Sequence, residues 1–292
     1  MENKRDWQSV FHEIDRDFDA WSAESLHAAF LRRGCVIVRQ GVGVELLARM
    51  RAAVHRAYER KPGLHVYSRD FQADAGATPF ALLANPKFKK FLALVYSRQL
   101  YLRMNATARR IQGAEENREW QEPLSLHLDA QFHRPQFTVN FWTPTEDCGI
   151  DRPTLQLVPV DYMSTRHYTG YTGRLLRQSE EAKLGYFSRE AFLLDHVEKS
   201  FGEDCFLRPT MRAGDVIIAS NWILHGTYRT PAMREGRTSL EIRFIGTDLD
   251  VRPYLRPVGR RVLGALTARG GETFTKPMSA RDHAPWPTNP AQ

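Results

Sequence analysis

The sequence predicts a mainly β fold of the sandwich or barrel type, preceded by helices. The main observation is a series of short apolar stretches of strand length, at 124–132, 137–142, 154–158, 215–219 and 238–246. Turn residues separate these stretches, among them Pro144, Gly149, Pro153 and Gly214. Short strands in series with regular turns are typical of sandwiches and barrels, whereas α/β folds alternate strands with helices. The part of the chain before residue 100 instead carries helical periodicity.

The N-terminal part begins with a predicted lead-in, a helix and a strand. Residues 1–20 are polar, and we expect them to be irregular. Ser22 is a suitable N-cap for a helix whose apolar residues recur at helical spacing, and Gly34 is expected to end that helix. Cys35–Arg39 is apolar and β-branched, which is typical of a short strand.

A second group of elements is predicted before the β-rich part. Helical spacing of apolar residues predicts a helix over 44–59, which Pro62 and the following glycine end. Residues 64–85 are rich in turn formers and are expected to form a loop. A third helix is predicted over 86–98, and the alternation over 100–108 predicts a strand.

The domain organisation predicted from these elements is one domain with an extension. Residues 1–250 form the domain, with its core strands at about 100–160 and 208–246. The segment 160–208 is an insertion with two helical stretches, and insertions of that length in a barrel often form a lid or a substrate-binding wall. Residues 251–292 are a C-terminal extension.

Composition excludes several classes of protein. The 292 residues are 42% apolar and 11% aromatic, which is enough for a packed core and argues against wholesale disorder. Charges interrupt every apolar run, so no transmembrane segment is predicted, and the first residues lack the apolar region of a signal peptide. Cys35, Cys148 and Cys205 are odd in number and widely spaced, which favours a reducing compartment, and we predict the cytoplasm.

The extension carries much of the net charge of +7, since it has seven basic and two acidic residues. A basic segment can attract anionic substrates, nucleic acid or a membrane surface, and it can equally be a solvated extension. No nucleic-acid-binding motif accompanies it, so no nucleic-acid partner is predicted. Its apolar residues near 258–266 suggest packing in a homodimer ahead of membrane contact.

His127 and Asp129 are the strongest candidates for metal ligands. In an extended strand the side chains of residues i and i+2 point to the same side, so these two would project together. One further histidine from another strand, such as His225, would complete two imidazoles and one carboxylate on one face. That ligand set, with the opposite positions open, suits non-haem Fe(II) that activates oxygen. Taken alone, a histidine in this setting is a structural strand residue more often than a metal ligand.

A second pattern of the same kind, His196-Val-Glu198, provides a comparison within the chain. Its neighbours have helical apolar spacing, and on a helix residues i and i+2 diverge by about 200°. The two side chains therefore cannot share a ligand face. We expect His196 to be an ordinary surface or helix-face histidine.

Several motifs follow one another over residues 22–246. They are Gly34-Cys-Val-Ile-Val-Arg39, His127-Leu-Asp129, Trp142, Cys148-Gly149, Leu155-Gln-Leu-Val-Pro159, Gly214-Asp215-Val-Ile-Ile218, His225-Gly226 and Arg237-Thr-Ser-Leu240. In order and spacing this series resembles the phytanoyl-CoA dioxygenase-like family of Fe(II)/2-oxoglutarate-dependent oxygenases. The resemblance implies a double-stranded β-helix (jelly-roll, cupin-like) core with flanking N-terminal helices and a helical insertion. It also implies that His127, Asp129 and His225 hold the iron.

The resemblance further implies which residues meet the cosubstrates 2-oxoglutarate and O2. The distal carboxylate of 2-oxoglutarate needs a fixed, bidentate cation, and Arg237 is the residue in that position. Arg234 and Arg243 are the alternatives. Thr227 matches a hydroxyl that helps to hold the same carboxylate, although a plain turn residue is an equal alternative. On the strand after the first ligands, Trp142 and Asn140 could line the same pocket, and a buried core tryptophan is the other interpretation.

The predicted activity is hydroxylation, or a related oxidation, of an unactivated C–H bond in a small anionic or carrier-linked metabolite of specialised metabolism. Asp129 favours hydroxylation over halogenation, because halogenating members of the family carry a small residue there. The segment after Pro159 departs from the Gly-Ser-His run of many relatives, so the acyl-CoA substrate is not carried over. The alternatives are a cupin-like metal-dependent hydrolase or isomerase without 2-oxoglutarate, and a non-enzymatic β-barrel binding protein.

Overall fold

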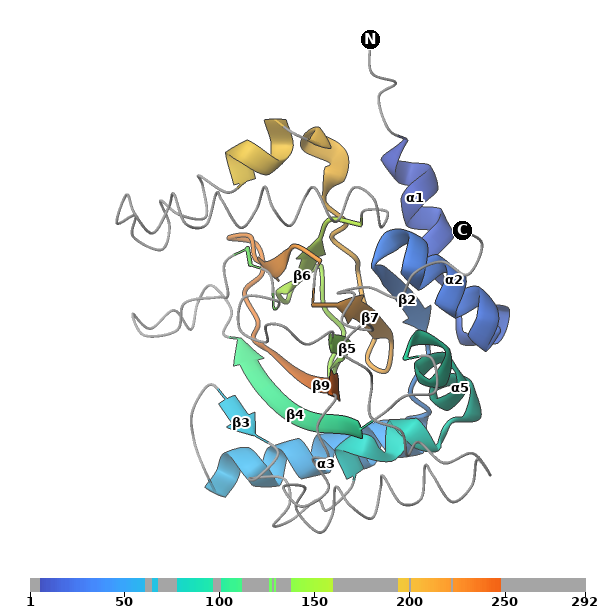
Figure 1. The fold of residues 1–292 in the computed structure, drawn as a ribbon. Coiled ribbons are helices and arrows are strands. Elements are labelled where there is room, and N and C mark those ends of the chain that lie inside the picture. Colours follow the sequence, from blue (N-terminus) through green and yellow to red (C-terminus); the bar gives the residue numbers. More distant parts are fainter. Residues whose placement is uncertain are drawn as a thin grey trace.

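The computed structural model describes residues 6–60, 65–67, 78–96, 101–111, 126, 127, 129, 138–159, 194–199, 201–221 and 223–247. Within these residues the strands form a seven-stranded and a two-stranded sheet (Figure 1). The order in the large sheet is β1 (Asp15–Asp17), β2 (Cys35–Arg39), β7 (Val216–Ser220), β5 (Thr138–Pro144), β9 (Arg237–Thr247), β4 (Tyr101–Ile111) and β3 (His65–Tyr67). Only β1 and β2 pair in parallel among these strands. The small sheet pairs β6 (Thr154–Leu157) with β8 (His225–Tyr228) in antiparallel fashion.

Helices and sheets together make this a mixed architecture. The α-helices with described bounds are α1 (Trp7–Ile14), α2 (Ala23–Arg33), α3 (Val44–Arg60) and α5 (Pro86–Val95), and residues 194–199 are also helical. The 3-10 helices with described bounds are η1 (Phe18–Ala20), η2 (Thr78–Ala84) and η5 (Glu203–Cys205). The described strands confirm the predicted β-sheets, whereas the helices make the fold mixed and not mainly β as predicted.

One face of the large sheet packs against the helices through aromatic side chains. The ring of Phe141 on β5 lies 5.4 Å from Phe88 and 6.2 Å from Phe91, both on α5, in edge-on geometry. Phe244 on β9 is 5.2 Å from Phe141 on the same face, and Phe30 of α2 is 5.3 Å from Phe91. Buried aromatic rings in this arrangement contribute beyond the area that they remove from water. This face therefore supplies much of the core.

The opposite face of the same sheet is polar. Because side chains alternate along a strand, the neighbours of Phe141, which are Asn140 and Trp142, point away from the helices. By the same rule β9 presents a polar series on that face, made of Arg237, Ser239, Glu241 and Arg243. These residues line a pocket together with residues of β6 and β8, so the pocket lies between the two sheets.

The turn before β7 fixes that strand to its neighbour. Gly214 has a φ of +94°, which other residues rarely adopt, and its carbonyl accepts a hydrogen bond from Val42. Asp215 follows and is 1% exposed. Its carboxylate accepts from the Arg39 guanidinium at 2.8 Å, from the Gln40 N–H at 2.8 Å and from the Arg212 N–H at 2.9 Å. The buried carboxylate thus ties the end of β2 to the start of β7.

Most of the elements predicted from local signals are confirmed. Helix α2 has a capping box at Ser22 and ends at Gly34 with a φ of +69°. Helix α3 and helix α5 occupy the predicted places, α5 with Asn85 as its N-cap. The strands predicted at 35–39, 100–108, 137–142, 154–158, 215–219 and 238–246 are β2, β4, β5, β6, β7 and β9.

Two loop predictions are wrong. The lead-in at 1–20 contains α1, where Asp6 caps the helix by accepting from Ser9 and where Trp7, Val10 and Ile14 are buried. The loop at 64–85 contains β3 and η2, and β3 exists because it pairs with β4. The predicted strand at 124–132 is described only at 126, 127 and 129, where His127 forms an isolated bridge and Asp129 lies in a 3-10 turn.

Other predictions fall on residues outside the described part. These are the connection at 113–121, most of the insertion at 160–208, and the extension at 251–292. Of the insertion, residues 194–199 are helical as expected and η5 follows.

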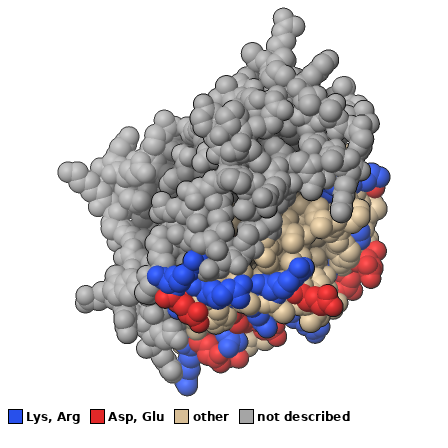
Figure 2. All heavy atoms as spheres, turned by 90° about the horizontal axis from the view of Figure 1, so that it is seen from below, with Lys and Arg blue, Asp and Glu red and all other residues tan. Residues whose placement is uncertain are grey.

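The outer surface over α3 carries charges of both signs. Its exposed residues include Arg49, Arg56, Glu45 and Glu59, and basic and acidic side chains lie side by side on the face shown in Figure 2. Such alternation is typical of a solvated helix surface. Among the described helices, none has the length and apolar character that a membrane crossing requires. Cys35, Cys148 and Cys205 are buried and form no disulfide.

Candidate metal centre

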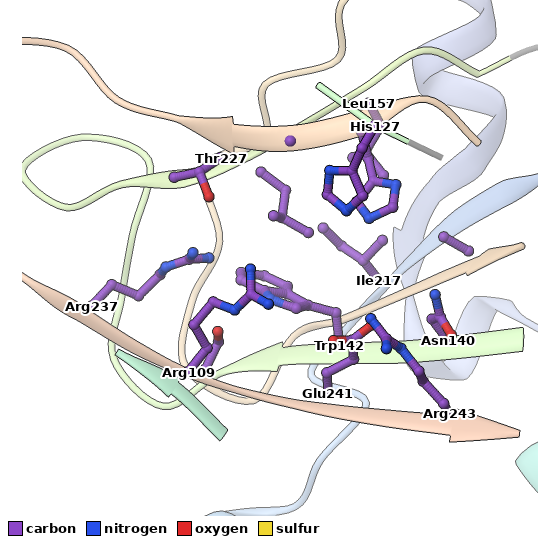
Figure 3. A pocket seen from close by; sticks show the side chains of 15 residues that line it. Arg109, His127, Asn140, Trp142, Leu157, Ile217, Thr227, Arg237, Glu241 and Arg243 are labelled. Atoms are coloured by element: carbon purple, nitrogen blue, oxygen red, sulfur yellow. The ribbon is translucent and has the colours of Figure 1, made fainter. Parts of the chain in front are cut away.

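His127, Asp129 and His225 come together between the two sheets. One ligand atom from each lies within 4.8 Å of the others. Asp129 Oδ1 is 3.5 Å from His127 Nε2, and the two imidazole rings are 4.4 Å apart between centroids (Figure 3). Asp129 is 1% exposed and His127 9%. A buried carboxylate beside two imidazoles is a set of donors that could hold a divalent cation.

Backbone hydrogen bonds hold the two histidines opposite each other. The N–H of His127 donates to the carbonyl of His225 at 2.9 Å, and the N–H of His225 donates to the carbonyl of His127 at 3.1 Å. This bridge places His127 beside the first residue of β8. The turn at Asp129 then brings its carboxylate back to the imidazoles, in place of the extended strand that the sequence predicted.

The protonation of His225 suits a metal ligand. Its Nδ1 lies 2.9 Å from the carbonyl oxygen of Ile223, which can only accept, so Nδ1 carries the proton and Nε2 keeps its lone pair. Burial, with the nearby His127, lowers the pKa of His225 to about 4. The imidazole is therefore neutral at neutral pH, the form in which histidine binds metals.

Asp129 stays ionised although it is buried. Burial alone would raise its pKa, but a hydrogen bond with His127 and the charge of Arg243 help to hold that pKa well below its usual range. Asn140 Nδ2 donates to Asp129 Oδ2 at 2.5 Å, and Arg243 Nη2 lies 3.3 Å from the same oxygen. Arg243 also donates from Nε to Glu241 at 2.9 Å. These contacts fix the orientation of the carboxylate.

A pocket opens beside this cluster. It encloses about 600 Å³, part of which is open to solvent. Its described lining is formed by Arg109, His127, Asn140, Trp142, Leu155, Leu157, Ile217, Ala219, His225, Gly226, Thr227, Arg237, Ser239, Glu241 and Arg243. A mixture of apolar walls with a few polar groups is typical of a small-molecule site.

Arg237 is the most unusual residue of the lining. It is 2% exposed, its guanidinium carbon lies 4.8 Å from the ring centroid of Trp142, and Thr227 lies nearby in the same view (Figure 3). Among the described residues, neither its Nε nor its Nη1 has a hydrogen-bond partner. Burial lowers the pKa of this guanidinium to about 10, and the charge of Arg109 acts in the same direction. A buried cation with open donors is expected to meet an anionic ligand.

The residues present therefore fit a metal and an anionic cosubstrate. Two imidazoles and a carboxylate supply one face of a coordination sphere, and the pocket lies beside it. Arg237 adds a buried guanidinium with open donors at Nε and Nη1 inside the same pocket, which suits an anionic group.

The structure brings together all the site residues named from the sequence. His127, His225, Asn140, Trp142, Thr227 and Arg237 line the pocket, and Asp129 contacts two of them. Of the two alternatives to Arg237, Arg234 is exposed, whereas Arg243 lines the pocket and contacts Asp129. His196 lies on the helical segment 194–199, next to Asp195, as expected of a surface residue.

Sequence reasoning missed three features of the site. They are Arg109 on β4, Glu241 beside Arg243, and the Ile223 carbonyl that orients His225. Alternation along β9 could have found Glu241, because it shares a face with Arg237. No local signal identifies Arg109, since its place depends on how β4 pairs with β9.

Comparisons with known proteins agree with this geometry. Residues 30–236 match the phytanoyl-CoA dioxygenase (PhyH) family, and this range contains every residue of the cluster. No curated protein matches the chain in overall sequence.

Three solved structures share the fold. SnoK, a non-haem alpha-ketoglutarate-dependent carbocyclase from nogalamycin biosynthesis, is 16% identical with a TM-score of 0.52, over 78% of this chain and 87% of SnoK. HygX from Streptomyces hygroscopicus, solved with nickel and 2-oxoglutarate, is 17% identical with a TM-score of 0.52, over 78% and 88%. EctD from S. alaskensis is 11% identical with a TM-score of 0.53, over 80% and 81%.

Proposed function

We propose that His127, Asp129 and His225 bind iron in this chain, which belongs to the phytanoyl-CoA dioxygenase family. The protein is an oxidoreductase, an Fe(II)- and 2-oxoglutarate-dependent dioxygenase. The observation that carries the assignment of residues is the position of the buried, incompletely hydrogen-bonded Arg237 in the same pocket as the His-Asp-His cluster.

Different residues of the pocket bind the cosubstrate, orient the metal ligand and exclude water. Arg237 and the hydroxyl of Thr227 hold the distal carboxylate of 2-oxoglutarate, with Trp142 as the wall beneath. Asn140 and Arg243 keep the Asp129 carboxylate in the orientation of a ligand. Leu155, Leu157 and Ile217 keep water from that part of the pocket. Iron with 2-oxoglutarate and O2 supplies oxidative cleavage of a C–H bond, and the protein decides which bond is presented.

The substrate that we propose is a small anionic or carrier-linked metabolite, oxidised by hydroxylation at an unactivated carbon. Asp129 supports hydroxylation, because its carboxylate occupies the position that halogenating relatives leave open. Specialised metabolism is supported by the fold shared with SnoK, which acts in nogalamycin biosynthesis. The cytoplasm and a homodimer stay predictions from the sequence.

We also propose that the two sheets are the faces of a double-stranded β-helix. The polar face of the large sheet and the β6–β8 pair lie on opposite sides of the pocket, which supports that arrangement. In it, the iron ligands and Arg237 would come from strands that meet inside one barrel.

The proposal is tested by anaerobic titration of the purified protein with Fe(II) and 2-oxoglutarate, followed by visible charge-transfer absorption. Wild type should give a band that requires both additions. His127→Ala should abolish the band, and His196→Ala, a histidine outside the pocket, should keep it. A folded wild-type protein that binds iron and shows no band would refute the assignment.

A further inference from the structure

Glu241 is an acidic residue in the pocket, and the roles assigned to the pocket residues so far do not include it. It lies on β9 between Arg237 and Arg243, and alternation places all three side chains on the pocket face of that strand. The side chain of Glu241 is 17% exposed. A carboxylate is unfavourable beside a site for a dianionic cosubstrate unless a cation neutralises it. The presence of Glu241 in this pocket therefore requires a partner.

That partner is Arg243, which contacts two carboxylates at once. Its Nε donates to Glu241 Oε1 at 2.9 Å, and its Nη2 lies 3.3 Å from Oδ2 and 3.4 Å from Oδ1 of Asp129. In Figure 3 Arg243 lies beside Glu241, away from Arg237. Because a guanidinium is planar and rigid, a carboxylate that holds Nε also sets the direction of Nη2. Glu241 therefore influences how Arg243 approaches the metal ligand.

The two contacts of Arg243 differ in length. Hydrogen bonds between a guanidinium and a carboxylate are usually about 2.7–2.9 Å long. The contact with Glu241 has that length, whereas both distances to Asp129 exceed it. Arg243 thus stands beside the metal ligand without forming the bidentate pair that arginine and a carboxylate readily form. Arg243 has further interactions, and Glu241 is the described carboxylate that holds its Nε.

A bidentate pair with Arg243 would compete with a cation for Asp129. Asn140 already donates to Asp129 Oδ2 at 2.5 Å, and Oδ1 faces His127 Nε2 at 3.5 Å. A guanidinium that closed on both oxygens would occupy Oδ1 as well, and its positive charge would repel a divalent ion. Keeping Arg243 at its present distance leaves Oδ1 to the metal.

We propose that Glu241 is a positioning residue of the iron site, which holds Arg243 beside Asp129 and neutralises its charge so that the arginine does not compete with the metal. This inference rests on the proposed function, because it assumes that His127, Asp129 and His225 bind iron. Partners that orient metal ligands commonly change metal affinity by about tenfold to a hundredfold when they are removed. An effect of the same size is expected at Glu241.

Three variants separate the ways in which Glu241 acts. Glu241→Ala removes both the anchor of Arg243 and its countercharge. Glu241→Gln keeps an acceptor for Nε and removes only the charge. Adding Arg243→Gln to Glu241→Ala removes the guanidinium that would otherwise close on Asp129. The matched control is Glu235→Ala, which breaks an ion pair of the same kind with Arg152, lies outside the described lining of the pocket and has a side chain that is 58% exposed.

The experiment measures the affinity of the full chain for Fe(II) under argon, by competition with a chromogenic chelator. Wild type and Glu235→Ala should bind alike. Glu241→Ala should bind Fe(II) about tenfold or more weakly, with Glu241→Gln between it and wild type. The double variant should bind Fe(II) more tightly than Glu241→Ala, because the competing guanidinium is gone. Two further readouts are urea unfolding of the metal-free proteins and 2-oxoglutarate titration of the iron-saturated proteins, in which Glu241→Ala should not lose affinity.

The inference is overturned if Glu241→Ala binds Fe(II) like wild type, or if the double variant binds it no more tightly than the single one, since Arg243 then does not compete with the metal. It is also overturned if the weaker Fe(II) binding only accompanies a partly unfolded protein, which would make Glu241 a structural residue. Loss of 2-oxoglutarate affinity by the iron-saturated Glu241→Ala would overturn it too, because Glu241 would then act on the cosubstrate. Wild type that binds Fe(II) no better than His127→Ala would instead overturn the proposed function.

Discussion

Replacing Arg237 with methionine should stabilise the cofactor-free protein while removing its affinity for 2-oxoglutarate. The guanidinium is 2% exposed, and burial lowers its pKa from an ordinary value of 12.5 to about 10. A displacement of that size corresponds to about 3 kcal/mol against the charged form in the folded protein. Contact with the ring of Trp142 at 4.8 Å offsets about 1 kcal/mol of this cost.

The net expectation is a gain of about 1–2 kcal/mol in the free energy of unfolding, because methionine fills most of the space without a charge. The melting temperature should rise by about 2–6 °C. Loss of two charge-assisted hydrogen bonds should weaken 2-oxoglutarate binding by at least about a hundredfold. Wild type should gain stability when 2-oxoglutarate is added in the presence of iron, and the variant should not.

The assay combines urea unfolding of the metal-free proteins with the anaerobic 2-oxoglutarate titration. Arg243→Met is the matched control, since it removes an arginine from the same face of β9 that already contacts Asp129 and Glu241. That control should lower stability, because it leaves buried carboxylates with fewer partners. The reasoning is wrong if Arg237→Met is less stable than wild type, which would make Arg237 a structural residue.

Two further predictions concern stability. Asp215→Ala should lower the free energy of unfolding by about 3 kcal/mol, since it leaves the three donors of Arg39, Gln40 and Arg212 without their buried acceptor. Urea unfolding measures this change, with the exposed Asp195→Ala as the control, whose free energy of unfolding should differ little from wild type. Equal effects of the two substitutions would contradict the prediction. The metal-free protein should also lose stability as pH falls from 6.5 toward 4, because unfolded His225 takes up a proton that the folded protein, with a pKa of about 4, refuses. The His225 contribution is at most about 3 kcal/mol, and a pH series of unfolding curves in which His225→Gln keeps the full dependence would exclude it.

Local signals in the sequence are sufficient to predict an element whose capping and terminating residues lie within its own segment. Helix α2 has its capping residue and its terminal glycine within the segment, so it could be predicted from that segment alone. Helix α1 also has local signals, an N-cap at Asp6 and buried apolar residues at helical spacing, which the prediction of an irregular lead-in missed. A distant contact adds to them, in which Trp7 Nε1 donates to the carbonyl of Phe201 at 3.1 Å. The strand β3 exists through its pairing with β4.

In the candidate site, too, some features could be predicted from local sequence and others depend on distant contacts. The proximity of His127 and Asp129 was predicted from a strand, and the structure brings them together through a bridge and a turn instead. The spacing of two residues was therefore a sound signal for the cluster although the local structure differs. For Arg109 and Arg110 the sequence offers two equivalent residues. Only the pairing of Arg109 with Ser239 shows which of them faces the pocket.

The large sheet separates stability from function between its two faces. Phe141 and Phe244 face the helices and supply apolar contacts that any sheet of this size needs. On the other face of the same strands lie charged residues whose burial is costly and which a sheet selected for stability alone would replace. Their presence is explained if the missing partners are ligands, as the open donors of Arg237 indicate. The cost of burying these charges is then a consequence of binding anions at a metal centre, because the groups that recognise a ligand must remain incompletely paired until it arrives.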